Sequence, residues 1–168
     1  MEVTLKKWQM SDRDVLTAIC NAIDRRYLSD HIPNPYTSAD AEWWLAMVGE
    51  NDGKTGVWRA IVVDGETIGT ISVEQREDVY RIDGEIGYYL TTKMASKGIM
   101  TEAARQICAL AFRELPLYRI TGQIYEPNIP SRRVLEKTGF ILEGQLKNAV
   151  IKDENIYDLC IYGKVKGA

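Results

Sequence analysis

A short glycine-containing segment is the first place in this sequence where residue types and spacing point to chemistry. It consists of Lys97, Gly98, Ile99, Met100 and Thr101 and opens a stretch with helical periodicity. The first N–H groups of a helix have no partner within the helix, and the helix dipole adds positive potential there. Phosphate groups bind at such ends. The segment is therefore a candidate anion-binding loop, to which Lys93 and Lys97 add positive charge.

No other residues have the spacing of a nucleophilic triad or a metal site. Cys20, Cys108 and Cys160 are widely spaced and odd in number, so we expect buried, reduced thiols and neither disulfides nor a metal centre. His31 is the only histidine and lies in a proline-containing loop, so we expect it at the surface or in a substrate loop. The sequence predicts no metal.

Composition and charge restrict the class of protein. The 168 residues are 45% hydrophobic and 27% charged, with no biased tract, which predicts a single globular domain over residues 1–168. Lysine and arginine total 21 against 24 acidic residues, so no global positive charge attracts a nucleic acid or an anionic membrane, and we expect neither as a partner. No apolar run approaches the ~20 residues of a membrane helix, and no signal peptide is evident, so we expect a cytoplasmic protein.

The first half of the chain predicts a strand, two helices and a hairpin. Residues 3–8 alternate as a strand does, and Ser11 is the expected N-cap of a helix. Prolines keep residues 25–37 out of a helix, and a second helix follows over 41–48. Residues 57–63 and 66–73 then flank Asp64 and Gly65, which are typical of a two-residue hairpin turn.

The second half predicts four more strands and two more helices. We expect strands at 85–90, 118–125, 140–146 and 156–165, and a long helix at 101–114. A short helix at 128–140 has Pro130 in its first turn and Gly139 after its end. The order β-α-α-β-β-β-α-β-α-β-β, without a linker, predicts an α/β fold built on a single mixed sheet.

The stretch from Gly84 to Phe140 resembles the acetyl-coenzyme A core of the GCN5-related N-acetyltransferases. The resemblance rests on the strand Gly-Tyr-Tyr-Leu before the glycine loop and on the later motif Glu-Pro-Asn-x-x-Ser-x-x-Val-Leu-Glu-Lys-x-Gly-Phe. Together these are similar to the ribosomal-protein alanine acetyltransferase branch. The resemblance implies a mostly antiparallel sheet flanked by helices, with acetyl-coenzyme A as co-substrate.

The resemblance also implies where the co-substrate lies. The strand containing Tyr88 and Leu90 would splay away from the strand at 118–125, and the pantetheine arm would fill the gap, bound by the backbone of Tyr88 and Leu90. The loop Lys97 to Thr101 would bind the pyrophosphate. Two residues depart from the family loop: Ala95 replaces an Arg or Gln, and Met100 replaces a Gly or Ala. We expect these changes to weaken binding rather than abolish it.

Four residues are candidates for the chemistry of amide formation, which needs a neutral amine and a stabilised leaving thiolate. By resemblance, Glu85 is the candidate base, with an ordinary strand carboxylate or a substrate-positioning group as the alternatives. Asn128 would bond the pantetheine arm and Ser131 would offer its hydroxyl to the departing sulfur, although both residue types are also common at helix starts. Tyr125 is the alternative acid.

The acceptor cannot be read from a motif. The resemblance favours an enzyme that acetylates a primary amine, most simply a protein N-terminal α-amine. Two alternatives stay open: an acetyltransferase of small amines such as amino acids, polyamines or antibiotics, and an acyl-coenzyme A-binding or interaction module without catalysis, which Ala95 and Met100 motivate. We expect the chain to act as a monomer or a homodimer.

Overall fold

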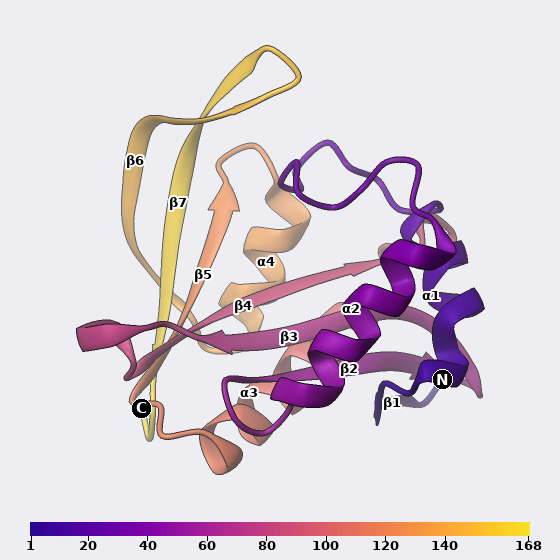
Figure 1. The fold of residues 1–168 in the computed structure, drawn as a ribbon. Coiled ribbons are helices and arrows are strands. Elements are labelled where there is room, and N and C mark those ends of the chain that lie inside the picture. Colours follow the sequence, from indigo (N-terminus) through magenta and orange to yellow (C-terminus); the bar gives the residue numbers. More distant parts are fainter.

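The computed structural model describes residues Met1 to Ala168 and contains one seven-stranded sheet with four α-helices (Figure 1). The strands are β1 (Val3–Lys7), β2 (Gly56–Val63), β3 (Glu66–Gln75), β4 (Asp83–Leu90), β5 (Arg119–Tyr125), β6 (Ile141–Lys152) and β7 (Asn155–Val165). The helices are α1 (Arg13–Cys20), α2 (Ser38–Asn51), α3 (Ile99–Glu114) and α4 (Ile129–Lys137). The predicted order of strands and helices is confirmed.

The sheet has the strand order β1-β2-β3-β4-β5-β7-β6, and every neighbouring pair is antiparallel except β4 and β5. This parallel pair is short: its register joins Asp83 to Arg119 and ends where Glu85 lies beside Thr121. Beyond that point the two strands diverge, as Figure 1 shows. We call this divergence the fork. The expected splay of the two strands is thus present.

Helices cover both faces of the sheet, and each face has its own core. The larger cluster joins the buried side of α3 and Leu135 of α4 to residues such as Ile61 and Ile86 of the sheet. The second cluster joins α1 and α2 to the other face, including Trp58 of β2. Because β2 contributes to both clusters, seven of its eight residues are buried, the near-continuous apolar pattern of a covered strand.

The helix starts follow from their caps, and one prediction here is wrong. Ser11 does not cap the first helix: a 3₁₀ turn over Met10–Asp12 precedes α1, and the backbone N–H of Gln9 donates to Asp12 Oδ2 at 2.8 Å. A carboxylate accepts this bond more strongly than the exposed serine hydroxyl would. Helix α2 begins at Ser38, three residues before the predicted 41, because Thr37 caps it and bonds reciprocally with Asp40.

The remaining expectations concern the hairpin turn, the thiols and the single histidine. Asp64 and Gly65 both have positive φ, as a two-residue hairpin turn requires. The three cysteines are free and buried, and His31 is exposed. No cluster of three or more His, Cys, Asp or Glu side chains gathers in the fold, and none of its helices has the length and hydropathy to cross a membrane.

The connection between α1 and α2 reaches the hairpin of β6 and β7. Lys152 Nζ donates to Asp30 Oδ1 at 2.6 Å, and Tyr27 packs edge-on against Tyr157. The β6–β7 hairpin extends beyond the rest of the sheet in Figure 1. These contacts therefore bring together segments about 120 residues apart beside the end of β5.

Candidate active site

The first turn of α3 carries backbone N–H groups without protein acceptors. Gly98 is the N-cap, with φ of 75° in the left-handed region, and no side chain caps the helix. The amides of Ile99, Met100 and Thr101 lie in the first turn, where a helix provides no acceptor. An added Cβ atom on Gly98 would meet nothing within 4 Å. Glycine is therefore needed here for its positive φ, and the turn is open to a ligand.

The two departures in this loop have different positions. Met100 is half-buried and packs against the larger core, so its side chain is not spread over the free amides. Ala95 is exposed and provides no side-chain hydrogen bond. Lys93 is paired with Glu66 at 3.3 Å at the surface, whereas Lys97 is exposed and makes no ion pair. Lys97 is therefore the cation that remains available beside the loop.

The fork leaves one edge of β4 without a neighbouring strand. Tyr88 and Leu90 pair with Ile71 and Gly69 of β3 on one side, but the register with β5 has already ended at Glu85. Backbone groups on the open edge need partners, which water or a ligand must provide. Because only eight residues separate the end of β4 from the start of α3, the free edge and the free helix start follow each other along the chain.

Asn128 and Ser131 lie at the start of α4, where both have structural contacts. The side chain of Asn128 caps the helix by accepting from the backbone N–H of Ser131 at 3.4 Å. The Ser131 hydroxyl donates to the hydroxyl of Tyr88 at 3.1 Å. Burial raises the pKa of the Tyr88 phenol, which therefore stays protonated near neutral pH. Ser131 is thus joined to the open part of β4.

Glu85 lies on the opposite face of β4 from Tyr88, beside charged neighbours. Arg76 Nη2 donates to Glu85 Oε1 at 3.2 Å, and the Glu85 side chain is 46% exposed. Glu74 lies directly across from Glu85 on β3. Burial, and then the negative charge of Glu85, raise the pKa of Glu74, while His31 opposes this. A base at this place would therefore have a second carboxylate next to it.

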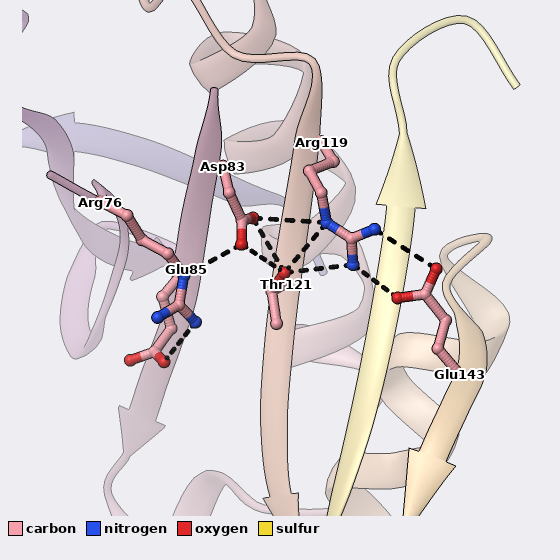
Figure 2. Close-up of polar contacts among 6 residues, drawn as sticks. All are labelled: Arg76, Asp83, Glu85, Arg119, Thr121 and Glu143. Carbon is pink, nitrogen blue, oxygen red and sulfur yellow. Dashed lines mark hydrogen bonds and ion pairs between the residues drawn. The ribbon is translucent and has the colours of Figure 1, made fainter. Parts of the chain in front are cut away.

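Figure 2 shows that Glu85 is one end of a chain of polar contacts that crosses the paired end of β4 and β5. Arg76 Nε donates to Asp83 Oδ2 at 3.0 Å, and Thr121 donates to Asp83 Oδ1 at 2.8 Å. Arg119 donates to the Thr121 hydroxyl at 3.3 Å and pairs with Glu143 of β6. We call this chain the polar junction; its members are Arg76, Asp83, Glu85, Arg119, Thr121 and Glu143.

Tyr125 has an aromatic surrounding rather than a catalytic partner. Its ring stacks on Tyr157 at a centroid distance of 6.1 Å and meets Tyr27 edge-on at 6.3 Å. Burial raises the pKa of Tyr125, and Lys152 partly offsets this effect. The three tyrosine rings pack against one another at the open end of β5, on the face of the sheet that α1 and α2 cover.

The predicted site residues thus converge on the fork from three directions. The free amides lie at the start of α3, Ser131 approaches from α4, and Glu85 and Tyr125 lie on the opposite face of the sheet. No hydrogen bond joins any two of Glu85, Ser131 and Tyr125. Sequence reasoning missed the side-chain role of Tyr88, the partner Arg76 and the second carboxylate Glu74. Glu74 lies just beyond the predicted strand 66–73, and its place opposite Glu85 follows from the register between β3 and β4, which alternation along a single strand does not give.

Comparison with protein families gives a match over most of the chain. Residues 2–141 match the acetyltransferase (GNAT) domain family. This range includes the start of α3, the fork and the start of α4. The matched range therefore contains every predicted site residue.

Individual relatives agree with the family match. YdaF of Bacillus subtilis, provisionally named a ribosomal N-acetyltransferase, is 33% identical over 111 residues, 66% of this chain and 60% of YdaF. The L-amino acid N-acetyltransferase AaaT of Escherichia coli is 22% identical over 88% of this chain and 83% of its own length. The chain thus spans less than two thirds of YdaF.

A solved structure shares the fold at low identity. RimL, a ribosomal L7/L12 α-N-protein acetyltransferase in complex with coenzyme A, superposes with a TM-score of 0.85 and 18% identity. The match covers 97% of this chain and 93% of the RimL chain. It shows that the whole described chain has the same fold as a protein that binds coenzyme A.

Proposed function

Because this chain belongs to the acetyltransferase (GNAT) family, we propose that it transfers the acetyl group of acetyl-coenzyme A to a primary amine, at a protein N-terminus. The observation that carries the proposal is the fork, with an unpaired edge of β4 that leads to the unpaired amides of α3. An elongated ligand that ends in a pyrophosphate matches both features. The fork would bind the elongated arm of the ligand, and the start of α3 would bind the negatively charged pyrophosphate.

The residues present fit such a ligand. Backbone groups of Tyr88 and Leu90 face the open side of the sheet, and the amides of Gly98 to Thr101 would hold the pyrophosphate, with Lys97 beside them. The amide nitrogen of Asn128 remains free to bond the arm, because the cap uses only Oδ1. When bound, acetyl-coenzyme A supplies the acetyl group as a thioester.

The side chains around the fork would divide the proton chemistry. Glu85 would take the proton from the amine, through the oxygen that Arg76 does not engage. An N-terminal α-amine has a pKa near ~8, so only mild assistance is needed at neutral pH. Ser131 would donate to the sulfur as negative charge develops. Tyr125 remains the alternative donor, although its ring is packed between two other tyrosines.

The choice of acceptor rests on the relatives. The name of YdaF and the RimL structure support a protein α-amine, and the name of AaaT supports a free amino acid as the second candidate. A binding module without turnover is the third candidate, and the exposed Ala95 motivates it, because it leaves the loop without the side chain that the family has there.

A panel of acceptors tests the proposal. We expect acetyl-coenzyme A to be consumed with peptides that begin with alanine or serine, and to be consumed more slowly with free amino acids or spermidine. Release of free coenzyme A, measured with a thiol reagent, is the readout. Faster consumption with a free amine than with the peptides would contradict the proposed acceptor but leave the proposed acetyl transfer intact. Binding of acetyl-coenzyme A without turnover of any acceptor would favour the binding module.

A further inference from the structure

Tyr88 reaches across the fork and touches Ser131, a contact that no backbone role for Tyr88 explains. Tyr88 belongs to β4 and Ser131 to the first turn of α4, 43 residues later. Both residues are half-buried, and the Tyr88 ring packs against the larger core. The phenol is therefore held in a fixed place beside the serine hydroxyl.

The Tyr88 hydroxyl has two acceptors within reach on the same residue. It donates to the backbone oxygen of Ser131 at 3.3 Å and accepts from Ser131 Oγ at 3.1 Å. In this arrangement the serine proton is directed to Tyr88 and away from any ligand. If the phenol proton turned from the backbone oxygen to Oγ, the serine proton would be released toward the fork. Only two hydroxyl rotations are needed, without movement of any heavy atom.

We propose that Tyr88 is a positioning residue that donates to Ser131 Oγ and thereby directs the Ser131 proton to the sulfur of bound coenzyme A. This inference rests on the proposed function. A serine hydroxyl whose oxygen accepts a hydrogen bond becomes a stronger hydrogen-bond donor through its own proton, because hydrogen bonds in a chain polarise one another. The two hydroxyls therefore act as one unit toward the sulfur.

The bonds and protons balance without a proton leaving Tyr88. The amine nitrogen forms a bond to the acetyl carbon, and the carbon–sulfur bond breaks with its electron pair on sulfur. The nitrogen loses one proton to Glu85, which passes it to water. The sulfur is stabilised by the Ser131 hydrogen bond and then takes one proton from water. Because burial raises the pKa of Tyr88, the phenol keeps its proton throughout.

Coenzyme A binding gives a readout that does not depend on turnover. A donor aimed at the sulfur favours the thiolate, so the thiol of bound coenzyme A should ionise at lower pH than the thiol of free coenzyme A. The affinity should then rise with pH. A shift of one pKa unit corresponds to about a tenfold gain in affinity between a pH well below the pKa of the bound thiol and a pH well above that of the free thiol.

The experiment measures Kd by calorimetry at several pH values for coenzyme A and for desulfo-coenzyme A, which lacks the thiol. We divide the Kd of desulfo-coenzyme A by the Kd of coenzyme A at each pH. This ratio rises when the thiol strengthens binding, and it removes the effect of every other titrating group. We expect the wild-type ratio to rise about tenfold, and Y88F and S131A each to reduce the rise below about threefold. Y89F is the matched control, because the Tyr89 hydroxyl contacts Cys20 on the other face of β4 at 3.4 Å.

Steady-state kinetics adds a second readout. Y88F should lower kcat about tenfold with little change in the KM for acetyl-coenzyme A, and the double variant should be no slower than S131A alone. A wild-type ratio independent of pH, or a Y88F ratio that rises as in the wild type, overturns the proposal while coenzyme A binding keeps the proposed function intact. Absence of any coenzyme A binding removes both.

Discussion

The two ends of the β4–β5 pair differ in the groups that lie between the strands. At the paired end, Asp83 and Thr121 join the strands through hydrogen bonds between side chains as well as through the ladder, and Arg119 extends the contacts to β6. At the open end there is no ladder, and the groups that face the fork are backbone amides, tyrosine rings and the Ser131 hydroxyl. The same two strands thus change from a closed structure to an open one within a few residues.

This difference indicates how one sheet can contain an opening between two neighbouring strands. Beyond the last residues that pair between β4 and β5, the facing edges of the two strands are free, and their backbone groups need other partners. The polar junction lies at that point. Glu85 belongs to both regions, because it is the last residue of β4 that pairs with β5 and its side chain is the proposed base. The predictions below separate the two regions by the property that each should affect.

The largest effect is expected at the start of α3. Gly98→Glu places a negative charge and a side chain with positive φ at the proposed pyrophosphate site, so acetyl-coenzyme A binding should be lost. In the wild type, ligand at one hundred times Kd should raise Tm by about 5 to 10 °C. Gly53→Glu is the matched control, because Gly53 has φ of 80° and open surroundings but lies in the connection between α2 and β2 instead of at the start of α3. A normal thermal shift in Gly98→Glu would contradict the assignment.

Glu85→Gln should lower kcat about 100-fold at neutral pH, because the proposed base is removed. The defect should shrink as the pH approaches ~8, where about half of the α-amine is neutral without help. Initial rates between pH 6.5 and 9 measure this. Glu74→Gln makes the same change on the neighbouring strand and should be mild. A raised KM without pH rescue would instead mean that Glu85 only holds the acceptor ammonium.

Ser131→Ala should lower kcat by about 10-fold to 100-fold with a smaller change in the Kd of acetyl-coenzyme A. Tyr125→Phe should have little effect, because the Tyr125 ring keeps its contacts with Tyr27 and Tyr157 when the hydroxyl is removed. Parallel kinetics of the two variants decides between the donors. If Tyr125→Phe is the slow variant, the assignment is reversed.

A change at the paired end should affect stability instead of binding. A Cβ atom on Gly163 of β7 would overlap the contact between Arg119 and Glu143, and both side chains have flexible ends that can move aside. Gly163→Ala should therefore lower the free energy of unfolding by about 1 kcal/mol, the upper value for a partly exposed ion pair. Urea unfolding measures this. A large change in the Kd of acetyl-coenzyme A would show that the two regions are coupled.

The smallest effect concerns pH at the same place. The hydrogen bond from Arg119 lowers the pKa of Glu143, so the folded protein holds this carboxylate ionised to lower pH than the unfolded chain does. Its contribution to stability is present above the unfolded pKa of ~4.3 and is lost as the pH falls through the folded value. The Glu143→Gln variant should therefore lose less stability than the wild type between pH 5 and pH 3.5. The difference between the two losses should be less than about 1 kcal/mol.

Local patterns predicted most of the fold, and the loop at Gly98, because periodicity, caps and turn residues act over a few positions. The exceptions are also local. The predicted strand at 140–146 continues to Lys152, because β6 is an exposed edge strand without clear alternation of polar and apolar residues. The 3₁₀ turn before α1, with the bond from Gln9 N–H to the Asp12 carboxylate, was missed because a serine before an apolar-periodic stretch is the commoner sign of a helix start.

The contacts within the site could not be predicted in the same way. Tyr88 and Ser131 meet only because α4 packs beside the fork, and Arg76 came from a polar stretch that resembled an ordinary loop. Tyr27, Tyr125 and Tyr157 belong to three separate segments. Such pairings depend on how the elements pack, and the sequence pattern of each element holds no information about its partner.

The short register between β4 and β5 has a consequence for cooperativity. Strands β1 to β4 and strands β5 to β7 are each joined by long antiparallel ladders, but only three residue pairs connect the two groups. The backbone hydrogen bonds therefore divide the sheet into two units that can open with different free energies. A ligand bonded to both edges of the fork would join these units, so occupancy should make amide hydrogen exchange across the whole sheet more uniform.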